Sequence, residues 1–152
     1  MPIFSKRSLE NLEGCAPNLQ IVAKDAIKRF DFAVVCGNRG KIDQEQAFKD
    51  GRSKVHYPKS AHNFIPSRAM DLVPYWDKIP HIRWGEKSDY AALSQEEKTS
   101  YPTFEDYRDV CVLAFNKMAR EIFSSAQKFN VKIEWGGNWK MQDLPHFQEK
   151  RT

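Results

Sequence analysis

The stretch Ser60–Asp71, Ser-Ala-His-Asn-Phe-Ile-Pro-Ser-Arg-Ala-Met-Asp, sets the expectations for the whole chain. It contains His62 and Asp71, two residue types that bind zinc, nine positions apart. Asp71 opens a short apolar run that ends at Pro74, a pattern typical of a strand. A carboxylate in such a run is costly to bury unless a metal, a cation or hydrogen bonds hold it. We therefore treat His62 and Asp71 as candidate ligands of one metal ion.

A third candidate ligand, His146, lies near the other end of the chain in the segment Asp143-Leu-Pro-His146. Three protein ligands and an open fourth position are typical of a catalytic zinc site. Zinc lowers the pKa of bound water to about 7, and a second carboxylate is then needed to move protons. Asp143 suits that role because Pro145 excludes a helix and favours a turn leading into a strand. These residues predict a zinc hydrolase with one Zn2+ per chain.

The size and composition of the chain predict one domain over residues 1–152, without a separate module. At 152 residues and 41% hydrophobic content, the chain can bury a core without disulfides. Its three cysteines are widely spaced and form no Cys-x-x-Cys pair, which indicates free thiols. The apolar runs are only a few residues long, so we expect no membrane insertion.

The net charge of +4 is compatible with an anionic polymer as partner, either nucleic acid or a cell wall rich in carboxylates and phosphates. The Lys and Arg residues are scattered and no nucleic-acid-binding motif matches, so we expect no nucleic-acid partner. The first residues, Met-Pro-Ile-Phe-Ser-Lys-Arg, hold no apolar segment of the length of a secretory signal. We therefore expect the protein to remain in the cytoplasm unless something else releases it.

Apolar spacing predicts an α+β fold. Helices are expected over about 8–13, 17–30, 43–51 and 103–128, the third beginning with a capping box of Asp43 and Gln46. Strands are expected at 32–36, 71–73, 131–135 and 146–148. Residues 75–102 are expected to form a long insertion with one helical turn capped by Ser94. The few strands and their hairpin-like returns indicate a small antiparallel sheet packed against helices.

Three motifs surround the candidate ligands. They are Ser-x-His with Ala-x-Asp in the opening stretch, Trp135-Gly-Gly-Asn-Trp139, and Asp143-Leu-Pro-His146-Phe147. Together they resemble the zinc peptidases that cut the peptide stems of bacterial peptidoglycan. That family contains D-alanyl-D-alanine carboxypeptidases and dipeptidases, and also the L-alanyl-D-glutamate endopeptidases that phages use as endolysins. The resemblance runs from about Val34 to Phe147 and is strongest to the phage endopeptidase branch.

The resemblance implies that His62, Asp71 and His146 bind the zinc ion and that Asp143 is the catalytic base. The base is Asp where many relatives have Glu, which shortens its reach by one methylene and keeps the chemistry. The resemblance also implies that Arg39 steadies the substrate carbonyl as negative charge develops on it. A solvated arginine on a turn is the alternative for Arg39.

Two further residues are candidates for substrate contact. Ser60 can hydrogen-bond the substrate or orient His62, and Trp139 can line the cleft or pack at the surface. Glu134 lies in a predicted strand at the wrong spacing from His146 to be the base, so we expect it at the surface or behind the ligands.

These observations predict a zinc peptidase that cleaves peptidoglycan stems, at the L-alanyl-D-glutamate bond, as a phage lysis enzyme. We expect a monomer in the host cytoplasm that reaches the wall after another protein permeabilises the membrane. The alternatives are a D-alanyl-D-alanine carboxypeptidase or dipeptidase, and a non-catalytic, zinc-stabilised module that only binds the wall.

Overall fold

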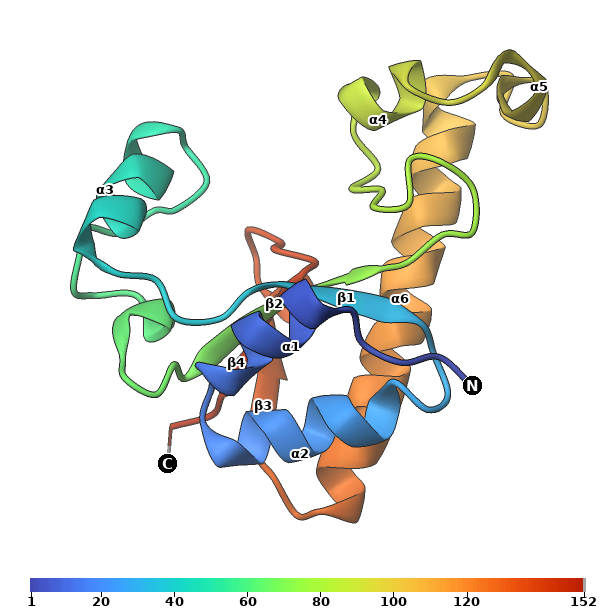
Figure 1. Ribbon diagram of the computed structural model, residues 1–152. Coiled ribbons are helices and arrows are strands. Elements are labelled where there is room, and N and C mark those ends of the chain that lie inside the picture. The colour runs from blue at the N-terminus through green and yellow to red at the C-terminus, as the bar shows by residue number, and fades with distance from the viewer. Residues whose placement is uncertain (152) are drawn as a thin grey trace.

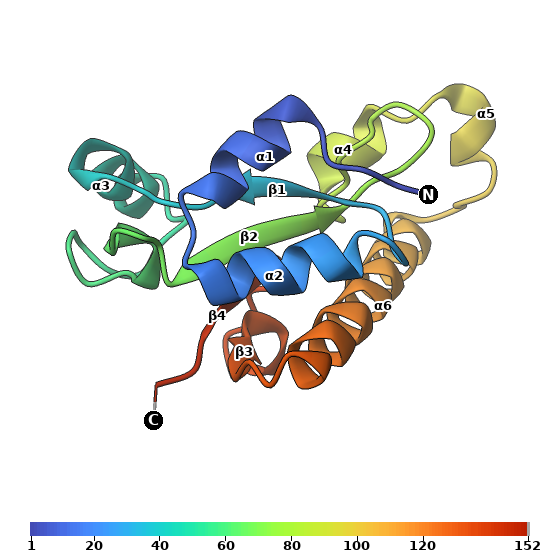
Figure 2. The same cartoon turned by 60° about the horizontal axis from the view of Figure 1, so that its bottom comes forward.

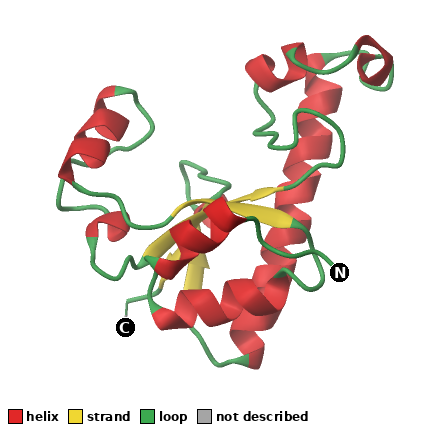
Figure 3. Ribbon diagram, in the orientation of Figure 1, coloured by secondary structure: helices red, strands yellow, loops and turns green. Residues whose placement is uncertain are grey.

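The computed structural model describes residues 1–151 and contains one four-stranded antiparallel sheet with helices around it (Figure 1, Figure 3). The strands are β1 (Phe32–Cys36), β2 (Ala69–Pro74), β3 (Ile133–Trp135) and β4 (His146–Glu149). Their order across the sheet is β1-β2-β4-β3, so the last strand in sequence lies between two earlier ones. The predicted α+β class with a small antiparallel sheet is confirmed.

Six α-helices and two short 3-10 helices complete the fold. The α-helices are α1 (Lys6–Glu13), α2 (Pro17–Ala26), α3 (Lys41–Lys49), α4 (Lys87–Ala91), α5 (Gln95–Lys98) and α6 (Phe104–Lys128). The 3-10 helices are η1 (Ala61–Asn63), just before β2, and η2 (Gly136–Asn138), just after β3. Figure 2 shows α2 and α6 running along the same side of the sheet.

The two faces of the sheet have different roles because side chains alternate along each strand. One face packs against α1, α2 and α6 and contributes to the main core, through Val34, Met70, Leu72, Trp135 and Phe147. The alternate positions place polar side chains on the opposite face: Asp71 of β2, Glu134 of β3, and His146 and Gln148 of β4. The polar face is where the candidate site lies.

Two helices of the core are joined by ion pairs around one buried carboxylate. Asp25 on α2 lies 2.9 Å from Arg29 and 2.9 Å from Lys128, and it accepts a hydrogen bond of 2.8 Å from Ser125. Lys128 and Ser125 belong to α6, so this carboxylate links α2 to the final turns of the longest helix.

The insertion 75–102 packs against the start of α6 and forms a second, smaller cluster. Leu93, Tyr107 and Cys111 are its buried members, with Tyr90 and Phe104 packed around them. Arg83 is almost fully buried here, and it donates 2.9 Å and 2.8 Å hydrogen bonds to Glu97 and to the Pro80 carbonyl. The helical turn expected after Ser94 is present as α5, with Ser94 as its cap.

The first three helices have boundaries that differ by a few residues from the prediction. The capping box of Asp43 and Gln46 is wrong: α3 begins at Lys41 after Gly40, and the Gln46 amide donates a 2.8 Å hydrogen bond to Asp50 instead. Helix α2 ends at Ala26, earlier than the apolar stripe indicated, because the chain turns there towards β1. Within residues 1–151, no helix combines the length and the hydropathy of a membrane span.

Candidate metal centre and active site

The pairing of β2 with β4 brings together candidate ligands from the two ends of the chain. Asp71 is the direct cross-strand partner of His146, so both side chains lie on the polar face of the sheet. The Nδ1 atom of His146 lies 3.4 Å from Oδ1 of Asp71. This contact joins residues that are 75 positions apart in sequence.

His62 reaches the same carboxylate oxygen from η1. Its Nε2 atom lies 3.2 Å from Oδ1 of Asp71, and the ring centroids of His62 and His146 are 5.1 Å apart. The η1 turn begins at Ser60, whose hydroxyl accepts a 3.2 Å hydrogen bond from the His62 backbone N–H. All three predicted ligands therefore converge on one point, with both histidines buried.

The remaining nitrogen of each imidazole is occupied by a hydrogen bond. Nδ1 of His62 lies 2.7 Å from the Gly37 carbonyl oxygen, and Nε2 of His146 lies 2.8 Å from Oε1 of Gln148. Each of these nitrogens must donate because its partner offers only lone pairs. The lone pairs that remain are those of His62 Nε2 and His146 Nδ1, which both face Asp71. Two imidazole nitrogens and a carboxylate are a donor set that fits zinc.

A cysteine also lies within ligand distance. The donor atoms of Cys36, His62 and Asp71 are all within 4.8 Å of one another, so this group can hold a metal ion. A bulge between Val34 and Cys36 shifts the register and places Cys36 opposite Asp71. However, Cys36 Sγ approaches His62 on its Nδ1 side, at 3.8 Å, where that nitrogen is bonded to the Gly37 carbonyl. The sequence indicated only a free thiol at Cys36, and nothing in the strand pattern indicates the bulge.

The electrostatics of the group favour a cation. Burial alone would lower the pKa of His62, but the Asp71 carboxylate outweighs it and raises that pKa to about 10. Burial would likewise raise the pKa of Asp71, and the two histidines together hold it well below its usual range. In the metal-free protein, a proton on the His62 imidazole therefore compensates the carboxylate, and a metal ion can replace that proton.

Asp143 lies on the turn between η2 and β4. Its backbone N–H donates a 2.9 Å hydrogen bond to the Gly136 carbonyl, and its own carbonyl accepts from His146 N at 3.2 Å. A Cβ atom on Gly136 would lie 2.3 Å from the Asp143 carbonyl oxygen, so only glycine allows this approach. Burial, followed by the nearby charge of Asp71, raises the pKa of Asp143. A raised pKa suits a group that accepts and returns a proton near neutral pH.

Arg39 also reaches the carboxylate, from the turn before α3. Its Nη2 atom lies 3.6 Å from Oδ2 of Asp71, and its Nη1 donates a 3.1 Å hydrogen bond to Gln44. Gln44 is fully buried and also accepts from Asn63, which in turn donates to the Arg39 carbonyl at 2.9 Å. Sequence reasoning did not find Gln44, although its position five residues after Arg39 on a helix is a usable signal.

The other candidates from the sequence lie beside the site or apart from it. Trp139 is partly exposed, and its ring centroid lies 5.0 Å from that of His146, beside the site. Ser60 uses its side-chain oxygen to hold the His62 backbone. The two remaining histidines lie apart from the group: His56 contacts Glu45, and His81 stacks on Tyr75.

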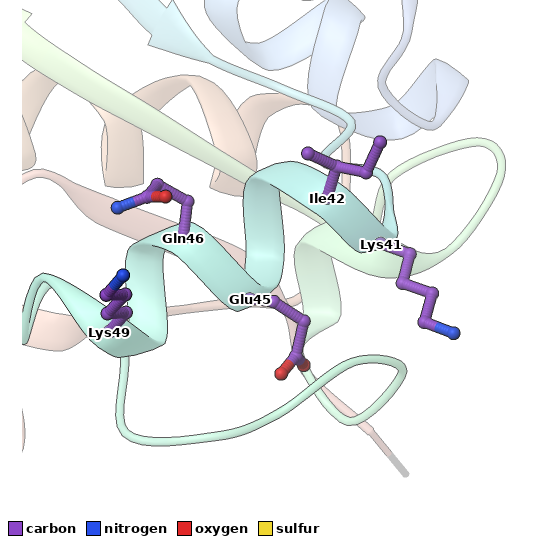
Figure 4. A pocket seen from close by; sticks show the side chains of 5 residues that line it. All are labelled: Lys41, Ile42, Glu45, Gln46 and Lys49. Atoms are coloured by element: carbon purple, nitrogen blue, oxygen red, sulfur yellow. The ribbon is translucent and has the colours of Figure 1, made fainter.

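A cavity of about 350 Å³ lies along α3, away from these residues (Figure 4). It is lined by Lys41, Ile42, Glu45, Gln46 and Lys49, all from that one helix. None of the candidate site residues lines it, so the cavity is separate from the candidate metal centre.

A sequence model of a family described as phage L-alanyl-D-glutamate peptidase matches residues 2–100. The chain belongs to this family. The matched residues include Arg39, His62 and Asp71, whereas Asp143 and His146 lie beyond them. The resemblance inferred from the motifs is therefore confirmed.

The fold of this peptidase is similar to the crystal structure of the Serratia marcescens L-Ala D-Glu endopeptidase ChiX. The two share 26% sequence identity with a TM-score of 0.66, and the match covers 97% of this chain and 90% of that one. The similarity thus extends over both halves of the candidate site, including the C-terminal segment outside the family match. No curated protein sequence matches the chain.

Proposed function

We propose that this peptidase hydrolyses the L-alanyl-D-glutamate bond of peptidoglycan stem peptides, with one zinc ion held by His62, Asp71 and His146. One observation carries the proposal. Two buried imidazoles direct one nitrogen each at a single carboxylate oxygen, at 3.2 Å and 3.4 Å, while their other nitrogens are anchored by hydrogen bonds. Membership of the phage L-alanyl-D-glutamate peptidase family supports the choice of bond.

The roles of the residues follow from their positions. A zinc ion in this site supplies a Lewis acid that lowers the pKa of water and polarises a carbonyl. Asp143 accepts a proton from the attacking water and returns it to the leaving amide nitrogen. Arg39, restrained by Gln44, donates to the carbonyl oxygen as negative charge develops there. Trp139 forms a wall beside His146 against which a stem peptide can lie.

The setting proposed for the reaction is the bacterial cell wall. The enzyme acts as a monomeric, single catalytic domain over residues 1–152, and it meets peptidoglycan after the inner membrane has been permeabilised. Size-exclusion chromatography with light scattering tests the oligomeric state. External addition to membrane-permeabilised cells, compared with intact cells, tests the requirement for access.

The decisive experiment is digestion of purified peptidoglycan followed by mass analysis of the fragments. New termini at L-alanine and D-glutamate are expected, and a zinc chelator should abolish them until zinc is restored. Release of free D-alanine would instead identify a carboxypeptidase or dipeptidase.

A variant separates catalysis from binding. Asp143→Asn should retain zinc and bind peptidoglycan, yet lose about 10²–10⁴-fold in hydrolysis because the proton acceptor is removed. Undiminished hydrolysis by this variant would exclude Asp143 as the base. A wild-type protein that binds the wall without releasing any fragment would be a non-catalytic, zinc-stabilised module.

A further inference from the structure

A chain of side-chain hydrogen bonds extends from the candidate ligand His146 across two strands. Nε2 of His146 lies 2.8 Å from Oε1 of Gln148, and Nε2 of Gln148 donates a 2.6 Å hydrogen bond to Oε1 of Glu134. Gln148 and Glu134 are partly buried, and His146 is buried. The three groups lie on the polar face of the sheet and outside the main core.

The chemistry of these groups fixes the direction of every hydrogen bond in the chain. A carboxylate only accepts, so Glu134 selects the NH2 end of the Gln148 amide. The Gln148 oxygen must then face His146, and it can only accept from Nε2–H. His146 is thereby held with its proton on Nε2 and its Nδ1 lone pair towards Asp71, 3.4 Å away. The Glu134 carboxylate thus sets the tautomer of the His146 imidazole through the Gln148 amide.

The register of the sheet builds this arrangement. Asp71 pairs with His146 across β2 and β4, and Gln148 pairs with Glu134 across β4 and β3. His146 and Gln148 are two apart in one strand, so they project from the same face. A slip of one residue between β3 and β4 would turn Glu134 to the core side and remove the acceptor for Gln148.

We propose that Gln148 and Glu134 are positioning residues that hold His146 in the ring orientation and tautomer required to bind metal through Nδ1. The inference rests on the proposed ligation by His146 and adds two residues that neither the motifs nor the family assignment single out. Partners behind a metal-ligating histidine fix its tautomer and raise its basicity, and their removal costs about 10–100-fold in metal affinity or activity.

The test measures zinc affinity of the full chain by competition with a chromogenic chelator, together with the visible spectrum of the cobalt-loaded protein. Gln148→Met removes both hydrogen bonds at similar volume and should weaken zinc binding about 10–100-fold. Gln46→Met is the matched control, because the Gln46 amide also donates to a carboxylate, Asp50, at 2.8 Å, but on exposed α3. The control should bind zinc as the wild type does.

A swap of the two side chains tests the direction of the bonds. Gln148→Glu alone sets two carboxylates against each other and should weaken zinc binding. In the double variant Glu134→Gln/Gln148→Glu, the amide introduced on β3 donates to the carboxylate introduced on β4, which still accepts from His146. The double variant should restore zinc affinity to within about threefold of the wild type, and the cobalt spectrum with it. If Gln148 and Glu134 only stabilised the pairing of β3 with β4, the variants would change the unfolding of the metal-free protein. Zinc affinity would then not show this pattern of loss and rescue.

Three outcomes overturn different statements. Zinc affinity unchanged in Gln148→Met overturns the positioning role, whatever the activity of that variant. Zinc affinity unchanged in His146→Ala overturns the proposed ligand set itself, and with it the proposed function. Loss in both Gln148 single variants without rescue in the double swap also overturns the positioning role, because the direction of the bonds is then immaterial.

Discussion

Asp25 and Asp71 are both largely buried aspartates whose pKa is held well below the usual range, yet the two carboxylates have different partners. Asp25 is bonded to Lys128, Arg29 and Ser125, all of which stabilise its charge permanently at neutral pH. Asp71 is flanked by His62 and His146, whose imidazole nitrogens can bind a metal ion in place of a proton. Burial and charge alone therefore do not distinguish a structural carboxylate from a proposed ligand. The chemistry of its partners does.

The first prediction compares the effects of substituting each of the two aspartates. Asp71→Asn should lower zinc affinity more than about 100-fold, because a ligand matters more than the groups behind it, and hydrolysis should fall with it. Asp25→Asn should leave both quantities unchanged, since its partners lie in the turn after α2 and on α6. Chelator competition and fragment release from peptidoglycan measure the two effects. Equal losses in the two variants would remove the distinction between them.

The second prediction concerns the third ligand beside Asp71. His146→Ala should lower zinc affinity by about 100-fold or more, whereas Cys36→Ser should retain it, because Cys36 faces the anchored side of His62. Zinc content after dialysis against a weak chelator gives the comparison. The reverse result would assign the metal to Cys36, His62 and Asp71.

The third prediction concerns the base rather than the ligands. Gly136→Ala pushes a Cβ against the Asp143 backbone, and a displacement of about 1 Å at a catalytic group can cost about 100-fold in kcat. Zinc affinity should change much less than hydrolysis, because His62 and Asp71 are held by η1 and β2, away from this turn. Gly40→Ala is the control, since a Cβ there meets nothing within 4 Å. Full activity of Gly136→Ala would indicate that Asp143 need not be held so tightly.

The fourth prediction concerns the structural aspartate. Asp25→Ala removes the hydrogen bonds that join α2 to α6 and should lower the free energy of unfolding by about 2–3 kcal/mol. For a chain of this size that corresponds to roughly 5–10 °C in Tm. Asp109→Ala, at an exposed position of the same helix α6, should change little. Thermal unfolding of the metal-free proteins measures both.

The smallest expected effect is the pH dependence of that contribution. The pKa of Asp25 is lower in the folded state than its unfolded value of about 3.9. Its stabilisation is therefore complete above about pH 5 and decreases as the pH falls through 3.9 towards the folded pKa. Urea unfolding of wild type and Asp25→Asn at about pH 5 and about pH 2.5 should show the difference between them shrinking at the lower pH. A constant difference would mean that the charge of Asp25 is not what stabilises the pair of helices.

The sequence predicted the features that depend on local chemistry. It did not predict the contacts that depend on the register between strands. The strand signals at 32–36 and 146–148, and the helix beginning after Thr103, were sufficient for the α+β class because apolar spacing and capping are local. His62, Asp71 and His146 could be proposed together from their residue types, and the motif resemblance supported that choice. The position of Cys36 opposite Asp71 depends on a bulge, and the contact of Gln148 with Glu134 depends on which residue of β3 Gln148 faces. The register in which two strands pair cannot be read from the sequence of either strand alone.

The order of the strands has a consequence for the synthesis and folding of the chain. Strand β4 is the last of the four to leave the ribosome, yet it occupies an interior place between β2 and β3. A nascent or truncated chain that stops before residue 146 lacks both the closure of its sheet and one imidazole of the site. Under the proposed ligation by His146, hydrolysis therefore requires the completed sheet.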